Sequence, residues 1–368
     1  MKAVCHREGL LSACQLASAA IPAKELKPIL KNVKAVAGDG RCTLIATDLE
    51  VGIRLDVQGL TIQEPGEAIL PAAKLIAILR ESRDNELSIE TDASGCTIRG
   101  AQLEYEMPGE DPGQFPDFPY FTDDHYHEIT AGSLREMIRR TVFATADETA
   151  RYAITGVLWE AEGDVIRLVA TDGRRLAIAE GLGTSIGGHS TRGQLPVVPS
   201  KAMNLLERNL QDDAEETVKV SLRPNEVLFR TGRSVIYSRL VEGRFPDYRA
   251  VLPKKSAFEV SLNVVDFQAA VRQAAIMTDN DSKRVTFKFT PDRLTLLAQG
   301  AGSGRSKVEM PLSYTGKAMD IHFNPDYLIE MLKVLPPDSS LSVELTGPDS
   351  PALFRCGKTY SYLVMPLT

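Results

Sequence analysis

The chain has 368 residues, of which 43% are hydrophobic and 25% are charged, and its formal net charge is −7. At roughly 100–200 residues per domain, this length suggests two or three globular domains, and the composition excludes a disordered, collagen-like or coiled-coil chain. No apolar run approaches the ~18 residues of a membrane span, and the first residues lack the apolar core of a signal peptide, so we expect a cytoplasmic protein.

The cysteines and the net charge bear on which kinds of site and partner the protein can have. Cys5, Cys14, Cys42, Cys96 and Cys356 are scattered without a Cys-x-x-Cys pair. They indicate neither a disulfide framework nor a zinc site, and we interpret them as small reduced hydrophobic residues. The negative net charge argues against a nucleic-acid partner, unless the basic residues are segregated onto one face.

Six segments with apolar residues at i, i+3 and i+4 spacing predict helices, two in each third of the chain. In chain order they are 7–20, 71–83, 131–143, 199–210, 263–277 and 324–335. The second segment of each third opens at a proline, Pro71, Pro199 or Pro325. Proline at the first helical position loses no hydrogen bond, so all three prolines predict helix starts.

Related strand phrases lie between the two helices of each third. Apolar strands are predicted at 42–48, 166–172 and 294–300, and each runs through a tight turn into a further strand. Alternation in 218–222 and 285–289 is typical of antiparallel sheets with one buried face.

Each third closes on a similar phrase, at 115–118, 245–248 and, less closely, 364–367. The repeat predicts an α+β fold with three tandem copies of one domain, each with two helices packed on antiparallel sheets. We expect the domains to span residues 1–123, 124–253 and 254–368, because the junctions are polar and close to proline.

Basic residues are enriched in the predicted helices, whereas the strands and loops carry the net negative charge. The basic residues of these helices include Lys74, Arg80, Arg83, Arg135, Arg139, Arg140, Lys201 and Arg208. One interpretation is that they form the solvated faces of amphipathic helices. The other is a positively charged helical lining that attracts phosphates without reading bases.

Two local motifs favour plain structural interpretations. The segment 300–307 is rich in glycine but lacks the order of a phosphate-binding loop, so a hairpin is the better prediction. The segment 123–128 has metal-ligand residue types, but it falls at a predicted domain junction and is interpreted as a linker.

The most distinctive phrase is Asp172-Gly173-Arg174-Arg175, which follows a predicted strand. In an enzyme, it pairs an acid with phosphate-binding arginines. As structure, it is a turn in which glycine permits a positive φ and the aspartate bonds the backbone. The related Asp48 in the first third has no arginine pair after it.

Three phrases, at 170–177, 242–248 and 363–367, together with the length and the threefold repeat, resemble the bacterial DNA polymerase III beta subunit family, the DNA sliding clamps. The resemblance covers the whole chain. It implies a non-catalytic replication processivity factor without a cofactor or metal. Each chain would form half of a closed ring, a head-to-tail homodimer whose helices line a hole for double-stranded DNA.

The resemblance also implies sites, residue by residue. A hydrophobic pocket would receive a short peptide from the DNA polymerase III alpha subunit, the clamp loader and other replication and repair proteins. Its matching residues are Ile154, Thr171, Gly173, Arg174, Arg175, Leu176, Pro246, Val251, Leu363, Val364, Met365 and Pro366. The implied DNA-contacting residues are Lys24, Arg80, Arg83, Arg139, Tyr152 and Lys201. The implied dimer interface contains Leu103, Tyr105, Ile276 and Met277.

The chain departs from the family pattern at Arg174, where histidine is frequent, and at Ala153, where a tyrosine can stand beside Tyr152. On the residues alone, the C-terminal phrase 363–365 also fits a simple edge strand. Two other functions compete with the clamp. One is a phosphate-handling enzyme built on Asp172, Arg174 and Arg175, and the other is a multidomain adaptor that never encircles DNA.

Overall fold

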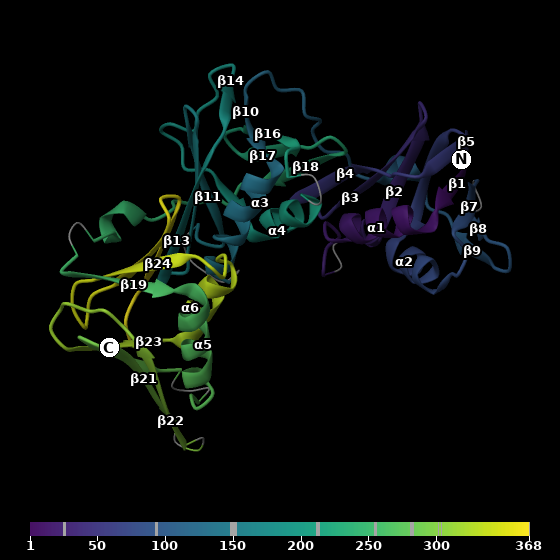
Figure 1. The fold of residues 1–368 in the computed structure, drawn as a ribbon. Coiled ribbons are helices and arrows are strands. Elements are labelled where there is room, and N and C mark those ends of the chain that lie inside the picture. The colour runs from purple at the N-terminus through teal and green to yellow at the C-terminus, as the bar shows by residue number, and fades with distance from the viewer. Residues whose placement is uncertain are drawn as a thin grey trace. The chain divides into compact units, whose positions relative to one another are not determined.

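The computed structural model describes residues 1–24, 27–92, 95–147, 153–210, 214–253, 256–279, 283–300, 302 and 304–367. Contacts divide the chain into two compact units, and each unit contains two antiparallel sheets (Figure 1). The first unit comprises residues 1–132, 183–190 and 201–240, and the second comprises 133–182, 191–200 and 241–368.

The first unit contains a five-stranded and a nine-stranded sheet. The five-stranded sheet has, in spatial order, β5 (Leu60–Glu64), β1 (Lys2–His6), β7 (Glu86–Thr91), β8 (Gly95–Arg99) and β9 (Glu104–Pro108). The nine-stranded sheet has β14 (Thr184–Ile186), β10 (Tyr126–Thr130), β16 (Thr217–Leu222), β17 (Glu226–Arg230), β18 (Ser234–Arg239), β4 (Val51–Asp56), β3 (Arg41–Thr47), β2 (Asn32–Gly38) and β6 (Gly66–Pro71).

The second unit contains an eight-stranded and a four-stranded sheet. The eight-stranded sheet has β15 (Val197–Pro199), β11 (Gly156–Glu162), β12 (Val165–Thr171), β13 (Arg175–Leu182), β26 (Tyr360–Val364), β25 (Ala352–Cys356), β24 (Ser340–Leu345) and β19 (Phe258–Asn263). The four-stranded sheet has β22 (Gly304–Pro311), β21 (Arg293–Gly300), β20 (Val285–Thr290) and β23 (Met319–Phe323).

The helices fall in the six predicted windows. They are α1 (Arg7–Ser18), α2 (Ala72–Glu81), α3 (Ala131–Arg139), α4 (Ser200–Asn209), α5 (Val264–Ala275) and α6 (Pro325–Lys333). The short 3-10 helices are η1 (Pro28–Lys31), η2 (Pro112–Gln114), η3 (Val142–Ala144) and η4 (Tyr248–Val251). Pro325 is the first residue of α6, whereas Pro71 and Pro199 directly precede their helices, so the predicted helix starts hold to within one residue.

Helices pack on the sheets through one apolar stripe each. Helix α1 buries Leu10 and Leu16 and contacts β3 and β4, while α5 buries Phe267 and Val271 and contacts β21 and β22. Within each unit one helix pair packs together, α1 with α2 and α5 with α6 (Figure 1). Asn263 starts α5 by accepting two backbone hydrogen bonds, as N-cap residues do.

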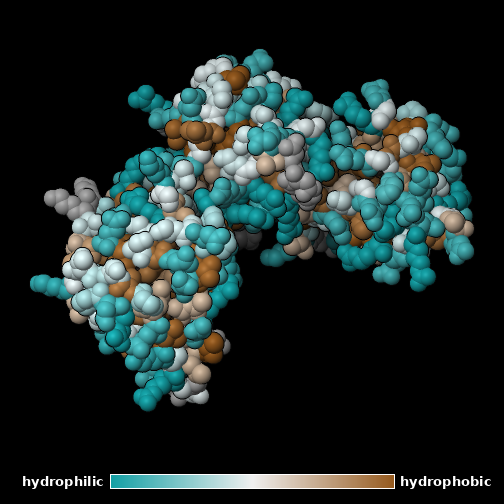
Figure 2. Space-filling view, viewed as in Figure 1, coloured by the Kyte–Doolittle hydropathy of each residue, from teal (hydrophilic) through white to brown (hydrophobic). Residues whose placement is uncertain are grey.

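The predicted period-two alternation is confirmed in β20 and holds in β16 only as far as Val220, because Ser221 of β16 is buried. Val218 and Val220 of β16 are buried, as are Val285, Phe287 and Phe289 of β20, with half-buried residues between them. Polar residues dominate the visible surface, and hydrophobic residues reach it in patches (Figure 2). None of the described helices has the length and hydropathy needed to cross a bilayer.

All five cysteines are buried thiols, as the sequence predicted. Burial raises the pKa of Cys5, Cys42 and Cys96 to about 11, so each stays protonated at neutral pH.

Two sheets join strands from successive thirds of the chain. β4 pairs with β18 in the nine-stranded sheet, and β13 pairs with β26 in the eight-stranded sheet. Each third contains one corresponding hairpin, β3 with β4, β12 with β13 and β21 with β22, so β4, β13 and β22 are the strands after the hairpin turn. β9, β18 and β26 are each the last strand of their third. β22 and β9 lie at sheet edges, so within the described chain each has one unpaired side.

Candidate functional site

An apolar cluster covers one end of a face of the eight-stranded sheet. Leu158, Val169 and Ile178 lie side by side on β11, β12 and β13, because the register places them opposite one another. Leu176 and Leu363 form the next cross-strand pair, between β13 and β26. The full set of buried residues is Ala153, Ile154, Leu158, Val169, Leu176, Ile178, Val197, Phe245, Tyr248, Leu353 and Leu363. The second and last thirds of the chain therefore share one core here.

The turn between β12 and β13 borders this cluster and is held by its own side chains. The Thr171 hydroxyl donates to the Arg175 carbonyl at 2.6 Å and accepts from the Gly173 amide at 3.1 Å. Asp172 Oδ1 accepts from the amides of Arg174 and Arg175 at 2.9 and 3.0 Å. Gly173 has a φ of 88°, which favours glycine. The structural interpretation of Asp172 is therefore confirmed.

The Arg175 side chain is buried, and its donors bond within the chain. Nε donates to Asp172 Oδ2 at 2.9 Å, Nη1 to Glu330 of α6, and Nη2 to the Phe143 carbonyl at 2.8 Å. Burial alone would lower the pKa of Arg175, but Tyr362 and Glu330 raise it above its usual value. Arg175 thus ties the turn to α6 and η3, and its predicted contact with a peptide stays a prediction.

Exposed residues surround the cluster at the surface. Val251 at the end of η4 is 50% exposed and Met365 is 40% exposed, which is unusual for such apolar side chains. The Met365 amide donates to the Arg174 carbonyl at 2.9 Å, which extends the pairing of β26 past its last residue. Pro246 is also exposed. We call Val251, Met365 and Pro246 the rim.

The twelve pocket residues predicted from the sequence all lie in the second unit. Ile154, Thr171, Arg175, Leu176, Leu363 and Val364 are buried, Gly173, Arg174, Pro246, Val251 and Met365 are exposed, and Pro366 is half-buried. The cluster also contains Leu158, Val169, Ile178 and Tyr248, which the sequence did not predict as site residues. Leu158 and Val169 lie on the same face as Glu160 and Arg167, so apolar residues that interrupt this polar face were the available signal for two of them.

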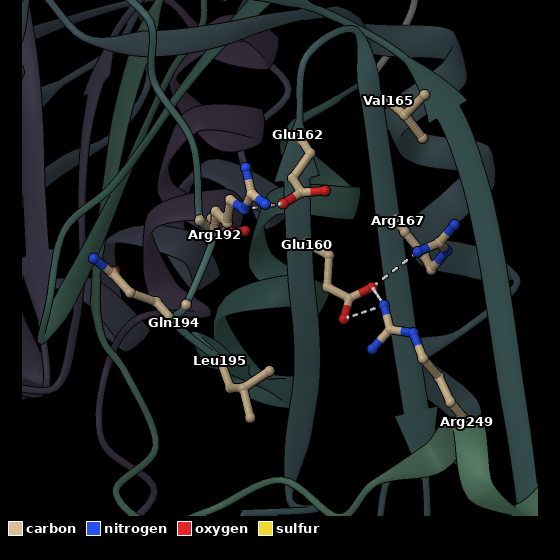
Figure 3. Close-up of a pocket in the computed structure, with 10 residues that line it drawn as sticks. Glu160, Glu162, Val165, Arg167, Arg192, Gln194, Leu195 and Arg249 are labelled. Atoms are coloured by element: carbon tan, nitrogen blue, oxygen red, sulfur yellow. Dashed lines mark hydrogen bonds and ion pairs between the residues drawn. The ribbon is translucent and has the colours of Figure 1, made fainter.

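A row of charged residues continues the same sheet face beyond the cluster (Figure 3). Glu160 of β11 accepts from Arg167 of β12 at 3.0 Å, from Arg249 of η4 at 2.8 Å and from the Tyr248 hydroxyl at 2.8 Å. Burial alone would raise the pKa of Glu160, but these hydrogen bonds hold it below its ordinary value. Burial and the bond to Glu160 raise the pKa of Tyr248 to about 12.

This charged row positions one wall of the site. Tyr248 places its ring in the apolar cluster and its hydroxyl on Glu160, and Arg249 follows it in η4. Since Val251 ends the same short helix, Glu160 holds η4 and the rim residue together. The adjoining cavity of about 580 Å³ is lined by charged and polar residues that include Glu162 and Arg192 and by the apolar Val165 and Leu195 (Figure 3).

The residues predicted to contact DNA occupy different settings. Lys24, Arg80, Arg83 and Arg139 are exposed, and Tyr152 lies outside the described residues. Lys201 of α4 is half-buried, and its Nζ donates to Asp48 Oδ2 at 2.6 Å and to the Ala20 and Ile21 carbonyls at 3.3 Å. Its ammonium therefore also has a structural role, because it ties α4 to the residues just after α1.

The predicted dimer residues lie beside the two edge strands. Tyr105 of β9 is 43% exposed and the preceding Leu103 is half-buried. Ile276, which directly follows α5, is 70% exposed, and Met277 is half-buried. The Ser306 hydroxyl of β22 donates to the Ala274 carbonyl at 2.9 Å, so this apolar pair adjoins the edge strand.

The remaining motifs have structural roles. Gly300 pairs with Gly304, so the glycine-rich segment is the predicted hairpin. In the segment 123–128, Asp123 bonds Arg223, and His127 Nδ1 lies 2.6 Å from His189 Nδ1. No group of three or more possible metal-ligating side chains occurs in the part of the chain that the structure describes.

Comparisons with known proteins cover the full length. Family models of the DNA polymerase III beta subunit match its N-terminal domain at residues 1–119, its central domain at 128–247 and its C-terminal domain at 249–368. The chain is 29% identical to the beta sliding clamp of Proteus mirabilis and 28% identical to that of Escherichia coli K12, with 100% of both chains covered each time.

Solved structures agree with these matches. A DNA polymerase sliding clamp from Bacillus subtilis aligns with a TM-score of 0.91 at 25% identity, covering 100% of this chain and 99% of that one. A sliding clamp from Pseudomonas aeruginosa, bound to griselimycin, aligns with a TM-score of 0.90 at 27% identity and the same coverage.

Proposed function

This chain belongs to the DNA polymerase III beta subunit family and is a non-catalytic processivity clamp of replication, and we propose that two copies close head to tail into a ring around duplex DNA. Three clamp domains, each with two helices on antiparallel sheets, make up one chain. We place the domain boundaries near residues 123 and 253, and the family matches change over between 119 and 128 and between 247 and 249. Because it acts on replicating DNA, we assign the protein to the cytoplasm.

The strand-pairing rule of the repeat supports the ring. The strand after the hairpin turn of one domain pairs with the last strand of the next domain, as β4 does with β18 and β13 with β26. By the same rule, β22 needs the last strand of a following domain, and β9 needs the post-turn strand of a preceding one. A second copy supplies both, and head-to-tail pairing then closes both edges.

Apolar side chains beside both edges fit this interface. Ile276 and Met277 adjoin β22, and Leu103 and Tyr105 belong to the β9 edge. Burying such side chains at a subunit boundary stabilises association at roughly 25 cal/mol per Å² of apolar surface removed from water. We therefore expect Ile276→Asp with Met277→Asp to give monomers in sedimentation.

We assign DNA contact to Lys24, Arg80, Arg83, Arg139 and Lys201, together with Tyr152. Exposed cations on and beside helices bind phosphates without reading bases, which suits a protein that slides. The affinity of an open subunit for DNA should therefore be weak, independent of sequence and sensitive to salt. The acidic remainder of the chain repels DNA that is not threaded through the ring.

We assign partner binding to the apolar cluster and its rim. Exposed Val251 and Met365 lie over a packed floor that includes Leu176 and Leu363, an arrangement that takes apolar anchor side chains of a short peptide. The partners are the DNA polymerase III alpha subunit, the clamp loader, and other replication and repair proteins that carry such a peptide. Two or three anchors at roughly 1.5–3 kcal/mol each, less ordering costs, give micromolar affinity.

Topological retention tests the ring directly. The clamp would be loaded with its loader and ATP onto a nicked circular plasmid, and the plasmid would then be cut once or left intact. Clamp should remain on the circle through gel filtration and leave the linear DNA by sliding off its ends. Equal retention on both forms would contradict a ring, and so would the absence of retention on the circle with an active loader.

A further inference from the structure

The two edge strands carry opposite charges on the same side of their sheets. On β9, Met107 is buried, so Glu104 and Glu106 point to the other, outer face, where both are exposed. On β22, Ser306 bonds α5, so Arg305, Lys307 and Glu309 point to the outer face, where all three are exposed; the two cations lie at the start of the strand and Glu309 follows them. A strand alternates its side chains with period two, so each strand has one outer row.

The acidic row ends a ladder of alternating charges across the five-stranded sheet. Lys2 bonds Glu90 at 2.5 Å, Glu90 bonds Arg99 at 2.9 Å, and Arg99 bonds Glu104 at 2.7 Å. The ladder stops with a carboxylate at the sheet edge. Glu106 has no ion pair with any residue that the structure describes, so the edge presents negative charge outward.

The basic row borders a recess that lacks any carboxylate. A cavity of about 760 Å³ on the outer face of the four-stranded sheet is lined by Arg284, Arg305 and Lys307 and by uncharged residues. Arg284 and Arg305 form no ion pair within the described part of the chain, and Lys307 bonds Glu309 at 3.1 Å. Unpaired cations at an open strand edge favour an acidic occupant.

The repeat also gives the register between the two edges. Val51, the first residue of β4, lies opposite Ser238, and Arg175, the first residue of β13, lies opposite Val364. These partners are the last or next-to-last residues of their strands. By the same rule, Gly304, the first residue of β22, lies opposite Met107, the next-to-last residue of β9, and both residues are on the inner faces of their sheets. Antiparallel pairing then places Glu106 opposite Arg305 and Glu104 opposite Lys307.

We propose that the subunit boundary is electrostatically polarised, and this proposal rests on the ring proposed above. The acidic outer row of β9 lies against the basic outer row of β22 from a second copy. The polarity selects the partner edge. Two β9 strands would face carboxylate against carboxylate, and two β22 strands would face cation against cation, so only the head-to-tail pair is favourable. A clamp with the opposite polarity would be excluded from mixed rings.

Charge reversal with a matched control tests the polarity. Glu106→Lys is compared with Glu64→Lys, because both residues are exposed in one cross-strand row at opposite edges of the same sheet. The dimer dissociation constant is measured by sedimentation over a dilution series. We expect Glu106→Lys to weaken the dimer about 10-fold and Glu104→Lys with Glu106→Lys about 100-fold, with Glu64→Lys close to wild type.

Rescue separates polarity from damage to the fold. The fourfold variant, which adds Arg305→Glu and Lys307→Glu, restores opposite charges and should dimerise again. Native mass spectrometry with a mass-tagged wild type should show no mixed dimers. The proposed polarity, but not the ring, would be contradicted if the variant with Glu104→Lys and Glu106→Lys dimerised with wild-type affinity. It would also be contradicted if a folded fourfold variant stayed monomeric or formed mixed dimers with the wild type. A wild type that is monomeric at every concentration would instead overturn the ring.

Discussion

The chain contains the same junction twice, with different outcomes at the surface. At the first, the turn after β3 leads into β4, which pairs with β18; at the second, the turn after β12 leads into β13, which pairs with β26. The turns share their hydrogen bonds. Thr47 Oγ1 donates to the Val51 carbonyl at 2.8 Å, and Asp48 Oδ1 accepts from two amides, as Thr171 and Asp172 do. Leu49 has a φ of 81° where Gly173 has 88°.

Side chains at matching positions fill the first junction. Gly52 lies opposite Tyr237, and a Cβ at Gly52 would lie 2.7 Å from the Phe118 ring, so the ring occupies the space that a side chain would need. Phe118 stacks on Tyr237 at 5.7 Å, and the Arg54 guanidinium lies 3.9 Å from the rings of Phe118 and Tyr120. Aromatic and cation–π packing therefore seals this junction.

The second junction has aliphatic residues at the same positions. Leu176 and Leu363 replace Gly52 and Tyr237, and Ile178 stands where the first junction has Arg54. Met365 stands where the first junction has Arg239, the last residue of β18, which pairs with Glu50. One backbone frame thus supports either a sealed joint or an apolar surface, and side-chain exchange at a few positions decides which.

Removing the buried arginine of either junction should give the largest loss of stability. Arg54→Ala leaves the Phe118 and Pro119 carbonyls without their donor, and Arg175→Ala does the same to the Phe143 carbonyl and Glu330. We expect the free energy of unfolding to fall by about 3 kcal/mol in each variant, measured by urea titration. The neighbouring exposed Arg174→Ala is the control, with a change below about 0.5 kcal/mol. A loss at one junction only would mean that the two arginines are not equivalent.

Truncating the rim should separate the junctions by function. Val251→Ala and Met365→Ala each remove apolar surface that a peptide would bury, so the affinity for a fluorescent peptide from the polymerase alpha subunit of the same organism should fall about 10-fold. Arg239→Ala, at the matching position of the first junction, should leave the peptide affinity unchanged. Melting curves would verify that all three variants stay folded. Equal peptide binding by all of them would move the partner site elsewhere.

Acidification should weaken the first unit through His189, a smaller effect. Burial lowers the pKa of His189 in the folded chain, so the unfolded chain binds its proton at higher pH. The stabilisation is therefore complete above the ordinary pKa of about 6.5 and is lost as the pH falls below it. We expect the melting temperature to drop by a few degrees between pH 7.5 and pH 5.5, and His189→Gln to flatten this slope.

The repeat made much of the fold predictable, because Pro71, Pro199 and Pro325 and the apolar periodicity recur at the same spacing. It could not predict which strands of successive domains pair, since β13 and β26 meet only through the folded sheet. In the site, Leu176 and Leu363 came from a resemblance, not from spacing. Glu160 was missed because a glutamate in a mostly apolar strand gives no signal until Tyr248 and Arg249 are seen to bond it.

The open edges β9 and β22 have a genetic consequence. Each subunit of the proposed ring would have two different dimerisation surfaces, one at β9 and one at β22, and each ring would have two subunit interfaces. A mutant subunit with a damaged β22 and an intact β9 could still bind a normal subunit through one interface, and the resulting pair could not close into a ring. Such an allele should be dominant over the wild type. An allele that damages both dimerisation surfaces should be recessive, because its product binds no other subunit.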